Sequence, residues 1–448
     1  MSAFKAYDIR GIYGEDINEE LAYRIGYFLP ALLKTDHVVV GRDIRLSSQS
    51  LHDALVKGVT DSGADVWDLG LATTPMVYFA TAFLNVDASV QITASHNPKE
   101  YNGFKISRRG ALPVGGDSGL KDLEKLVDSG TLEIKEAKGS VKDYSHVKDE
   151  YISFLKPFAK GLETLNISID CSSGMSSLLI KDILSDAKCH YINDTFDGNF
   201  PAHEPNPLEE KNCAQIKAET IKNASDVGVI YDGDADRVMF IDEKGSFIQP
   251  DYITAVIGKY YASKGRTGNA LQDIRTSRSS TEYLESLGFS VTTWKVGHAY
   301  AKLKIREIDG IFGGELAGHY YFKDFFCCDS GILASLIVLS VVKDLKAEGK
   351  TFSSLISSIV KYANSGEVNF RLNDKDAAIK ALYERFAEND KPSAIMDFDG
   401  YRIEFPTWWF NVRKSNTEPY LRIVAEAKDK ALLEEKLGEI KAIIAKFS

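Results

Sequence analysis

Short apolar strands alternate with longer helical segments over most of this chain, and each cycle ends in a polar loop. In the first cycle the pattern predicts strands over 38–40, 64–69 and 88–92, a helix over 50–62, and a second helix opening at 73–75. Such alternation is typical of βαβ units, in which helices cover a parallel or mixed sheet. The chain is therefore expected to adopt an α/β fold.

The same pattern restarts twice further along. The second cycle predicts strands over 165–170, 189–192 and 227–231, with a helix over 175–187. The third cycle predicts helices over 252–264 and 299–308, with strands over 270–274 and 289–293. Three similar mixed α/β domains are expected to follow one another.

The C-terminal stretch has a different pattern. It predicts strands over 368–372, 408–413 and 421–427, a helix over 377–388, a hairpin over 395–405, and a long amphipathic helix at the end. The dipeptide Asp399-Gly400 is a strong hairpin signal because its residues accept positive φ. A smaller α+β domain with a largely antiparallel sheet is expected here.

The length of 448 residues requires more than one domain, because single cores stop growing near roughly 250–300 residues. We place the domains at 1–148, 149–248, 249–364 and 365–448.

Composition excludes several functional classes. A net charge of −10, with no long basic run, argues against nonspecific nucleic-acid binding. The apolar stretch 332–342 is too short to cross a membrane and predicts a buried helix. Five cysteines without a CxxC pair fit a reduced compartment. Since residues 1–5 lack the apolar core of a signal peptide, a cytoplasmic location is expected.

A serine follows the third predicted strand, in the run Thr93-Ala94-Ser95-His96-Asn97-Pro98. Ligand sites of open α/β sheets lie at strand ends. Ser95 is a candidate phosphoryl carrier, and His96 beside it could orient the group. Serine more commonly serves in turns and caps, and that alternative stays open from the residues alone.

Three aspartates follow the strand over 227–231, in the run Asp232-Gly233-Asp234-Ala235-Asp236-Arg237. Alternate side chains of extended backbone point the same way, so the carboxylates would converge and repel unless a cation lies among them. Such oxygen ligands suit Mg²⁺. A solvated acidic turn is the alternative, and the ligand pattern of an EF-hand is absent.

Two later loops carry further polar groups. Glu315, between Gly314 and Gly318, could bind two sugar hydroxyls. The run 413–417 combines guanidinium, hydroxyl and amide donors that suit a phosphate dianion. A plain acidic loop and a basic turn are the respective alternatives. Weaker candidates at loop-like positions are the residues 7–10, Lys105, Lys295 and His298.

Because of these loops, the chain closely resembles the α-D-phosphohexomutase family, which includes phosphoglucomutases and phosphomannomutases. The resemblance runs nearly end to end. The matching segments are 5–11, 93–98, 102–105, 232–237, 294–298, 314–319 and 413–419.

The resemblance implies four domains around a central cleft, with one loop from each domain. It implies reversible phosphoryl transfer between C1 and C6 of a hexose phosphate, through a phosphoserine and a glucose or mannose 1,6-bisphosphate. Mg²⁺ would be held by Ser95, Asp232, Asp234 and Asp236. The implied catalytic residues are Ser95, His96, Arg10, Lys105, Arg237 and His319, with His319 the candidate base. The implied substrate-binding residues are Tyr7, Arg275, Lys295, Gly297, His298, Glu315, Ala317, Arg413, Ser415, Asn416 and Thr417.

Two positions depart from the family pattern and leave the sugar preference open. Ala317 stands where serine is usual, and Arg275 stands where some relatives have lysine. Asn416 is similar to the phosphomannomutase/phosphoglucomutase type, since phosphoglucosamine mutases usually have glycine there. A phosphoglucosamine mutase, a Mg²⁺-dependent sugar phosphatase and a noncatalytic relative are the competing interpretations. The oligomeric state is open, and a monomer is compatible with the sequence.

Overall fold

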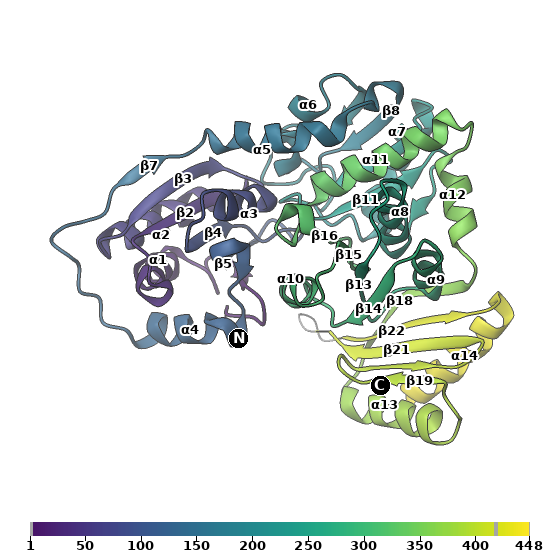
Figure 1. Cartoon of the computed structure of the whole chain (residues 1–448). Coiled ribbons are helices and arrows are strands. Elements are labelled where there is room, and N and C mark those ends of the chain that lie inside the picture. The colour runs from purple at the N-terminus through teal and green to yellow at the C-terminus, as the bar shows by residue number, and fades with distance from the viewer. Residues whose placement is uncertain (1–2, 416–419, 448) are drawn as a thin grey trace.

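The computed structural model describes residues 3–415 and 420–447. Its strands form four separate sheets, which we call units one to four together with their helices (Figure 1). Units one to three have mixed sheets, and unit four has an antiparallel sheet. The predicted α/β fold class is therefore confirmed.

Unit one has the strand order β1-β5-β4-β2-β3-β7, with β6 beside β5. Strands β4, β2, β3 and β7 run parallel, whereas β5 is antiparallel to β4 and β1. Its elements are β1 (Ile9–Ile12), α1 (Glu19–Leu33), β2 (His37–Arg42), α2 (Ser48–Asp61), β3 (Asp65–Leu71), α3 (Thr74–Phe83), β4 (Ala88–Ile92), β5 (Tyr101–Arg108), β6 (Leu112–Pro113), α4 (Leu120–Ser129) and β7 (Val141–Asp143).

Unit two has the order β12-β11-β10-β8-β9, with a parallel core of β10, β8 and β9. Its elements are α5 (Val147–Leu155), β8 (Asn166–Asp170), α6 (Ile180–Ile183), β9 (Lys188–Ile192), α7 (Ala214–Lys222), β10 (Val227–Tyr231), β11 (Val238–Asp242) and β12 (Phe247–Ile248).

The helix predicted over 175–187 is wrong. A 3-10 turn over Met175–Leu178 is followed only by the short α6, and Leu179 between them has φ −129° and ψ −36°, outside the helical region. The Met175 amide donates instead to the carbonyl of Gly233, which ties the start of this segment to the acidic loop.

Unit three has the order β14-β13-β15-β16-β17. Its elements are α8 (Pro250–Ser263), β13 (Asn269–Asp273), α9 (Arg278–Ser286), β14 (Ser290–Trp294), α10 (His298–Glu307), β15 (Phe312–Gly314), β16 (Tyr320–Phe322), β17 (Cys328–Asp329), α11 (Gly331–Ala347) and α12 (Phe352–Ile359). Helix α11 contains the predicted buried segment 332–342, every residue of which is buried. Within the described ranges, no helix combines the length and apolar character needed to cross a bilayer.

Unit four has the antiparallel order β18-β22-β21-β20-β19 and lies beside unit three, at the lower right of Figure 1. Its elements are β18 (Ala363–Arg371), α13 (Lys375–Tyr383), β19 (Ala394–Met396), β20 (Tyr401–Glu404), β21 (Trp408–Lys414), β22 (Tyr420–Ala427) and α14 (Lys430–Ile444). The predicted hairpin at Asp399-Gly400 is confirmed, since β19 pairs with β20 and Gly400 has φ 64°.

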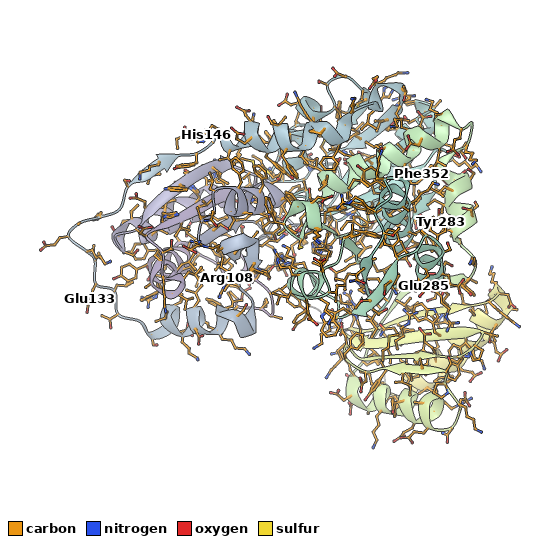
Figure 2. The ribbon with its side chains drawn as sticks, in the orientation of Figure 1. Arg108, Glu133, His146, Tyr283, Glu285 and Phe352 are labelled. Atoms are coloured by element: carbon orange, nitrogen blue, oxygen red, sulfur yellow. The ribbon has the colours of Figure 1, made fainter. Side chains whose placement is uncertain are left out.

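The apolar core explains how the units assemble. One cluster runs continuously through units two and three and reaches α3 of unit one, so these units share an interior. A second cluster lies within unit one, and a third fills unit four. Figure 2 shows side chains meeting where unit one adjoins unit three, whereas Glu133 projects from the outer edge of unit one.

Candidate active site

Ser95 lies at the carboxyl end of β4, in a loop with unusual backbone. Its φ of 51° is in the left-handed region, which non-glycine residues rarely adopt. Its amide donates to Thr93 Oγ1 (2.9 Å), and the Thr93 hydroxyl donates to Asp43 Oδ2 (2.6 Å). The Ser95 hydroxyl donates to Asp232 Oδ2 at 2.7 Å. The serine of unit one therefore directly contacts the acidic loop of unit two.

The three aspartates follow β10 and converge. Asp232, Asp234 and Asp236 are each at most 1 % exposed, and their ligand oxygens lie within 4.8 Å of one another. Ala235 has φ 62°, so the chain turns sharply between Asp234 and Asp236. The loop presents three carboxylates to a single point at the junction of the units.

Besides Ser95, two further side chains of unit one donate to these acids. Lys105 Nζ lies 2.8 Å from Asp234 Oδ2 and 2.5 Å from Asp236 Oδ2, and the Thr74 hydroxyl donates to Asp234 Oδ2 at 2.5 Å. Burial alone would lower the pKa of Lys105, but Asp234 and Asp236 outweigh it and raise the pKa. Lys105 lies in strand β5 rather than in the predicted loop, and it pairs there with Gln91 of β4.

Two carboxylate oxygens of the acid cluster could still accept a ligand. Among the described residues, Asp234 Oδ1 and Asp236 Oδ1 are buried without a hydrogen-bond partner. Burial, reinforced by Asp234 and Asp236, raises the pKa of Asp232 well above its usual range. Burial acts in the same sense on Asp236, but Lys105 and His319 outweigh it and lower that pKa. Buried, unpartnered carboxylate oxygens fit a hard divalent cation such as Mg²⁺.

His319 connects the acidic loop to unit three. Its Nε2 accepts from Arg237 Nε (2.9 Å), so Nδ1 carries the proton and donates to Asp329 Oδ2 (2.7 Å). Asp329 also pairs with the fully buried Lys302 (2.8 Å). Burial would raise the pKa of Asp329, but Lys302 and His319 hold it well below its usual value. Burial and then Lys302 lower the pKa of His298 nearby, so that imidazole is neutral.

Arg10 and His96 flank the serine. Arg10, in strand β1 rather than a loop, donates to Asn97 Oδ1 at 2.7 Å. His96 Nδ1 lies 3.4 Å from Ser95 Oγ. Burial, followed by repulsion from Arg237, lowers the pKa of His96 well below its ordinary value. His96 is therefore neutral and close enough to contact a group on Ser95.

The predicted sugar loop is held by its own unit. Glu315 is 3 % exposed; its Oε1 accepts from the Gly297 amide (2.6 Å) and its Oε2 from the Tyr321 hydroxyl (2.5 Å). Gly318 has φ 85° and closes the turn through its amide to the carbonyl of Glu315. Ala317 lies inside this turn, half-buried.

Tyr7 brings unit one against unit three. Its ring meets His298 and Tyr300 edge-on, at centroid distances of 5.9 and 5.3 Å, and its hydroxyl donates to the carbonyl of Val296 (3.3 Å). Gly297 has φ 129°, and a Cβ there would lie 2.9 Å from the Tyr7 ring. Only glycine fits this close approach. His298 is the first residue of α10, not a loop residue as predicted.

Unit four reaches the same segment through its hairpin turn. Asp399 Oδ2 accepts from the Val296 amide (2.8 Å), and Asp399 Oδ1 lies 4.0 Å from Arg413 Nη1. Arg413 is 4 % exposed at the end of β21. The Ser415 amide donates to the carbonyl of Tyr420 (2.9 Å). The other two predicted phosphate ligands, Asn416 and Thr417, lie outside the described residues.

Arg275 and Lys295 differ in how they are held. Arg275 pairs with Asp273 (2.8 Å) and with Glu367 of unit four (3.1 Å), so its guanidinium lies at the junction of units three and four. Lys295 Nζ lies 5.9 Å from the Trp294 ring centroid. Arg275 is fixed by acids, whereas the described contacts of Lys295 are with aromatic rings.

Sequence reasoning missed several residues that build the site. Thr74, Asp329, Asp43 and Arg45 touch predicted site residues or their loops, and Lys302 pairs with Asp329. None was marked by a motif, and the contacts of Thr74, Asp43 and Arg45 join residues at least 50 positions apart in the chain. The one available signal was the threonine and proline pair opening α3 at a strand end.

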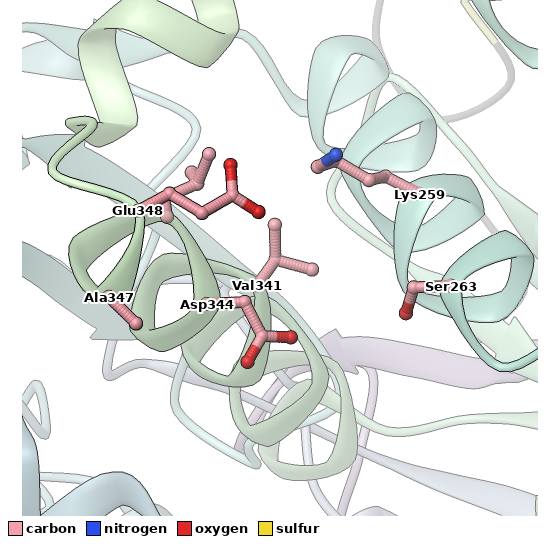
Figure 3. A pocket seen from close by; sticks show the side chains of 7 residues that line it. Lys259, Ser263, Val341, Asp344, Ala347 and Glu348 are labelled. Carbon is pink, nitrogen blue, oxygen red and sulfur yellow. The ribbon is translucent and has the colours of Figure 1, made fainter.

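A separate groove lies between α8 and α11 (Figure 3). Lys259 and Ser263 of α8 face Val341, Asp344 and Glu348 at the end of α11. None of the predicted site residues lines this groove, and it does not contribute to the site described above.

Comparison with known proteins agrees with this arrangement of units. Four models of phosphoglucomutase/phosphomannomutase domains match the chain: alpha/beta/alpha domain I over residues 1–133, domain II over 149–245, domain III over 249–362 and the C-terminal domain over 367–443.

Individual relatives match over nearly the full length. A phosphomannomutase of Salmonella montevideo is 36% identical over 453 residues, covering 98% of each chain. A phosphomannomutase of Escherichia coli K12 is 36% identical, covering 97% of each chain. A crystal structure of a phosphoglucomutase/phosphomannomutase family protein from Burkholderia thailandensis superposes with a TM-score of 0.88 at 28% identity, covering 98% of this chain and 96% of that one. The chain thus belongs to the phosphoglucomutase/phosphomannomutase family and is a phosphohexomutase enzyme of the phosphomannomutase type.

Proposed function

We propose that this enzyme moves a phosphoryl group reversibly between C1 and C6 of mannose or glucose phosphate, with Ser95 as the intermediate carrier. The observation that carries this proposal is the 2.7 Å hydrogen bond from Ser95 Oγ to Asp232, at the edge of three buried, converging carboxylates. A hydroxyl beside converging carboxylates that could bind a cation suits phosphoryl transfer, which needs alignment and charge stabilisation more than covalent chemistry.

Asp232, Asp234 and Asp236, with an oxygen on Ser95, would hold one Mg²⁺. The unpartnered oxygens of Asp234 and Asp236 are the observation that favours this assignment. When bound, the ion would neutralise charge on the transferring phosphoryl group.

The chain's own cations surround the serine. Lys105, Arg237 and Arg10 lie within the contact network of Ser95 and the three acids. They would stabilise the phosphoryl oxygens during transfer, and the neutral His96 would orient the group. The sugar 6-hydroxyl attacks the phosphorus, the bond to Ser95 Oγ breaks, and a 1,6-bisphosphate forms. The bisphosphate then turns end for end, and its 1-phosphoryl group returns to Ser95.

Each transfer moves one proton from a sugar hydroxyl and later returns it. His319 is our candidate for this role, because its protonated Nδ1 is bound to Asp329 and its Nε2 is an acceptor. Nε2 would exchange its contact with Arg237 for the sugar hydroxyl.

The remaining predicted residues would bind the sugar phosphate. Glu315 would accept sugar hydroxyls, with Tyr7, Gly297, His298 and Ala317 forming the wall beside it. Phosphate recognition is assigned to Arg413, Ser415, Asn416 and Thr417, with Lys295 and Arg275 at the same junction. With domain bounds at 1–148, 149–248, 249–364 and 365–448, each domain would contribute one loop to the site: the serine loop, the acidic loop, the sugar loop and the phosphate loop, in that order.

A coupled assay with purified enzyme and Mg²⁺ tests the function. Mannose 1-phosphate and glucose 1-phosphate should both yield the corresponding 6-phosphates once a trace of hexose 1,6-bisphosphate is supplied. Glucosamine 1-phosphate turned over faster than both would instead indicate a phosphoglucosamine mutase. Stoichiometric release of inorganic phosphate, with no isomerised sugar phosphate, would indicate a phosphatase and contradict the proposal.

A further inference from the structure

Arg45, on the turn between β2 and α2, forms hydrogen bonds with the loop that carries Ser95. Its Nη1 donates to the carbonyls of Pro98 (2.6 Å) and Tyr101 (3.0 Å). Its Nη2 donates to the carbonyls of Ser95 (2.8 Å) and Asn97 (2.6 Å). One fully buried guanidinium therefore satisfies four main-chain acceptors of a single loop. Charge-assisted bonds of this kind are among the stronger hydrogen bonds in proteins.

A second set of contacts links Arg45 to the backbone amide of Ser95 through Asp43 and Thr93. Arg45 Nε lies 3.3 Å from Asp43 Oδ2, which also accepts the Thr93 hydroxyl. Thr93 Oγ1 in turn accepts from the Ser95 amide. The Asp43 and Arg45 pair thus fixes both the amide and the carbonyl of Ser95.

The backbone of Ser95 requires such support. A non-glycine residue in the left-handed region is strained and persists only where its surroundings enforce it. At φ 51°, Ser95 directs its hydroxyl to Asp232 Oδ2. If the loop relaxed to negative φ, that hydroxyl would turn away from the acids.

Unit two covers the guanidinium. The Phe200 ring centroid lies 5.1 Å from the Arg45 guanidinium carbon, and Phe200 is itself buried with φ 51°. A Cβ on Gly198 would lie 2.5 Å from the carbonyl oxygen of Ile44. The turn 197–200 therefore packs closely onto the Arg45 turn, so that the same arginine joins the serine loop to the unit that supplies the acids.

We propose that Arg45 is a positioning residue for phosphoryl transfer: its four carbonyl contacts hold the Ser95 loop in the conformation that directs Oγ at the acid cluster. This inference rests on the proposed role of Ser95 as carrier. Arg45 contacts none of the predicted sugar-binding and phosphate-binding residues in its described hydrogen bonds, so its loss should impair transfer without impairing substrate binding.

The test uses the full-length enzyme with the variants Arg45→Met and Arg45→Lys. The matched control is Arg24→Met, since Arg24 also donates to two carbonyls, those of Val127 (2.5 Å) and Gly130 (2.8 Å), and packs on the Phe28 ring away from the site. For each protein, kcat, KM and the single-turnover rate of phosphoryl transfer from Ser95 to a hexose phosphate are measured, together with Tm.

We expect Arg45→Met to lower kcat and the single-turnover rate about 100-fold, the effect of a misplacement near 1 Å, while KM stays unchanged. Arg45→Lys keeps the charge but not the fork of donors, so its rates should lie between those of the methionine variant and wild type. Arg24→Met should keep wild-type kinetics. If Arg45→Met fails to fold, Arg45→Lys tests the inference in its place, and its kcat should fall while its KM stays unchanged.

Three results would overturn the inference. They are wild-type kcat in the folded Arg45 variant, a loss that lies mainly in KM, and an equal loss of kcat in Arg24→Met. A wild-type enzyme that never carries phosphate on Ser95 would instead overturn the carrier assignment, and this inference with it. Measuring the wild-type phosphoenzyme first separates the two failures.

Discussion

Two junctions between units bury acidic side chains, and they differ in how those acids are satisfied. Where units one, two and three meet, Asp234 and Asp236 each keep one buried oxygen without a hydrogen-bond partner in the described structure. Where units three and four meet, Glu426 is equally buried. It accepts from the Ser277 hydroxyl, the Arg278 amide (2.9 Å) and the Trp409 indole (2.8 Å).

Other groups at the second junction are similarly saturated. Arg402 donates to the carbonyls of Ile274 (3.0 Å) and Thr276 (2.7 Å) and lies 3.7 Å over the Trp409 ring. Glu367 is held between Arg275 and Arg422. At these two junctions, the buried acids with complete partners join the units, whereas the buried acids with unpartnered oxygens mark the place where a cation is expected.

The largest expected effect comes from Ser95→Ala. Loss of the carrier hydroxyl should lower kcat at least about 10³-fold, while Mg²⁺ binding persists because the three aspartates remain. Steady-state mutase assays and thermal shifts with Mg²⁺ measure the two quantities.

The matched control for that variant is Ser172→Ala. Ser172 is also buried at a strand end with φ 52°, and its hydroxyl donates to the carbonyl of Tyr231 (2.6 Å). It should lose about 1 kcal/mol of stability and keep its activity. If both serine variants lost activity equally, the distinction between Ser95 and a structural serine would fail.

Asp232→Asn should distinguish the repulsion among the three aspartates from their binding of Mg²⁺. Burial and the neighbouring acids raise the pKa of Asp232, so removing its charge should leave the metal-free enzyme at least as stable as wild type. The wild-type protein should gain about 2.7 kcal/mol at a Mg²⁺ concentration 100 times Kd, and the variant should lose this gain. An unchanged Mg²⁺ shift in calorimetry would show that the ion binds elsewhere.

Glu426→Gln should have the smallest effect on chemistry. The amide cannot accept all the hydrogen bonds that the carboxylate accepts, so a loss of about 1–3 kcal/mol of stability is expected. The Mg²⁺-induced thermal shift should equal that of wild type. A variant with normal stability and an altered Mg²⁺ shift would reverse the assignment of the two junctions.

Much of the fold was predictable from local sequence patterns. The strand over 227–231 has no charged or amide side chain, and the strand over 88–92 has apolar residues at alternate positions, so both strands and the polar loops after them could be recognised directly. The antiparallel C-terminal sheet followed from the Asp399-Gly400 turn. The helix predicted over 175–187 was wrong because the apolar residues of this segment pack into the core from two short helical pieces, with Leu179 buried at the break between them.

The site was predictable only in part. Ser95 and the three aspartates lie in compact loops whose spacing indicates their chemistry. Arg45 lies 50 residues from Ser95 in the sequence, and Asp329 lies 10 residues from His319. No local pattern marks a guanidinium that will meet four carbonyls or an acid that will orient a histidine. Those contacts form only when the chain of each unit has folded back on itself.

The most direct measurement asks whether Ser95 holds the phosphoryl group. Purified enzyme is incubated with glucose 1,6-bisphosphate and Mg²⁺, freed of ligand, digested, and its peptides are sequenced by mass spectrometry. We predict one phosphate, located on Ser95, which disappears when glucose 6-phosphate is added and reappears in glucose 1,6-bisphosphate. An active enzyme that carries no phosphate on Ser95, or whose Ser95 phosphate is never passed to the sugar, would contradict the account.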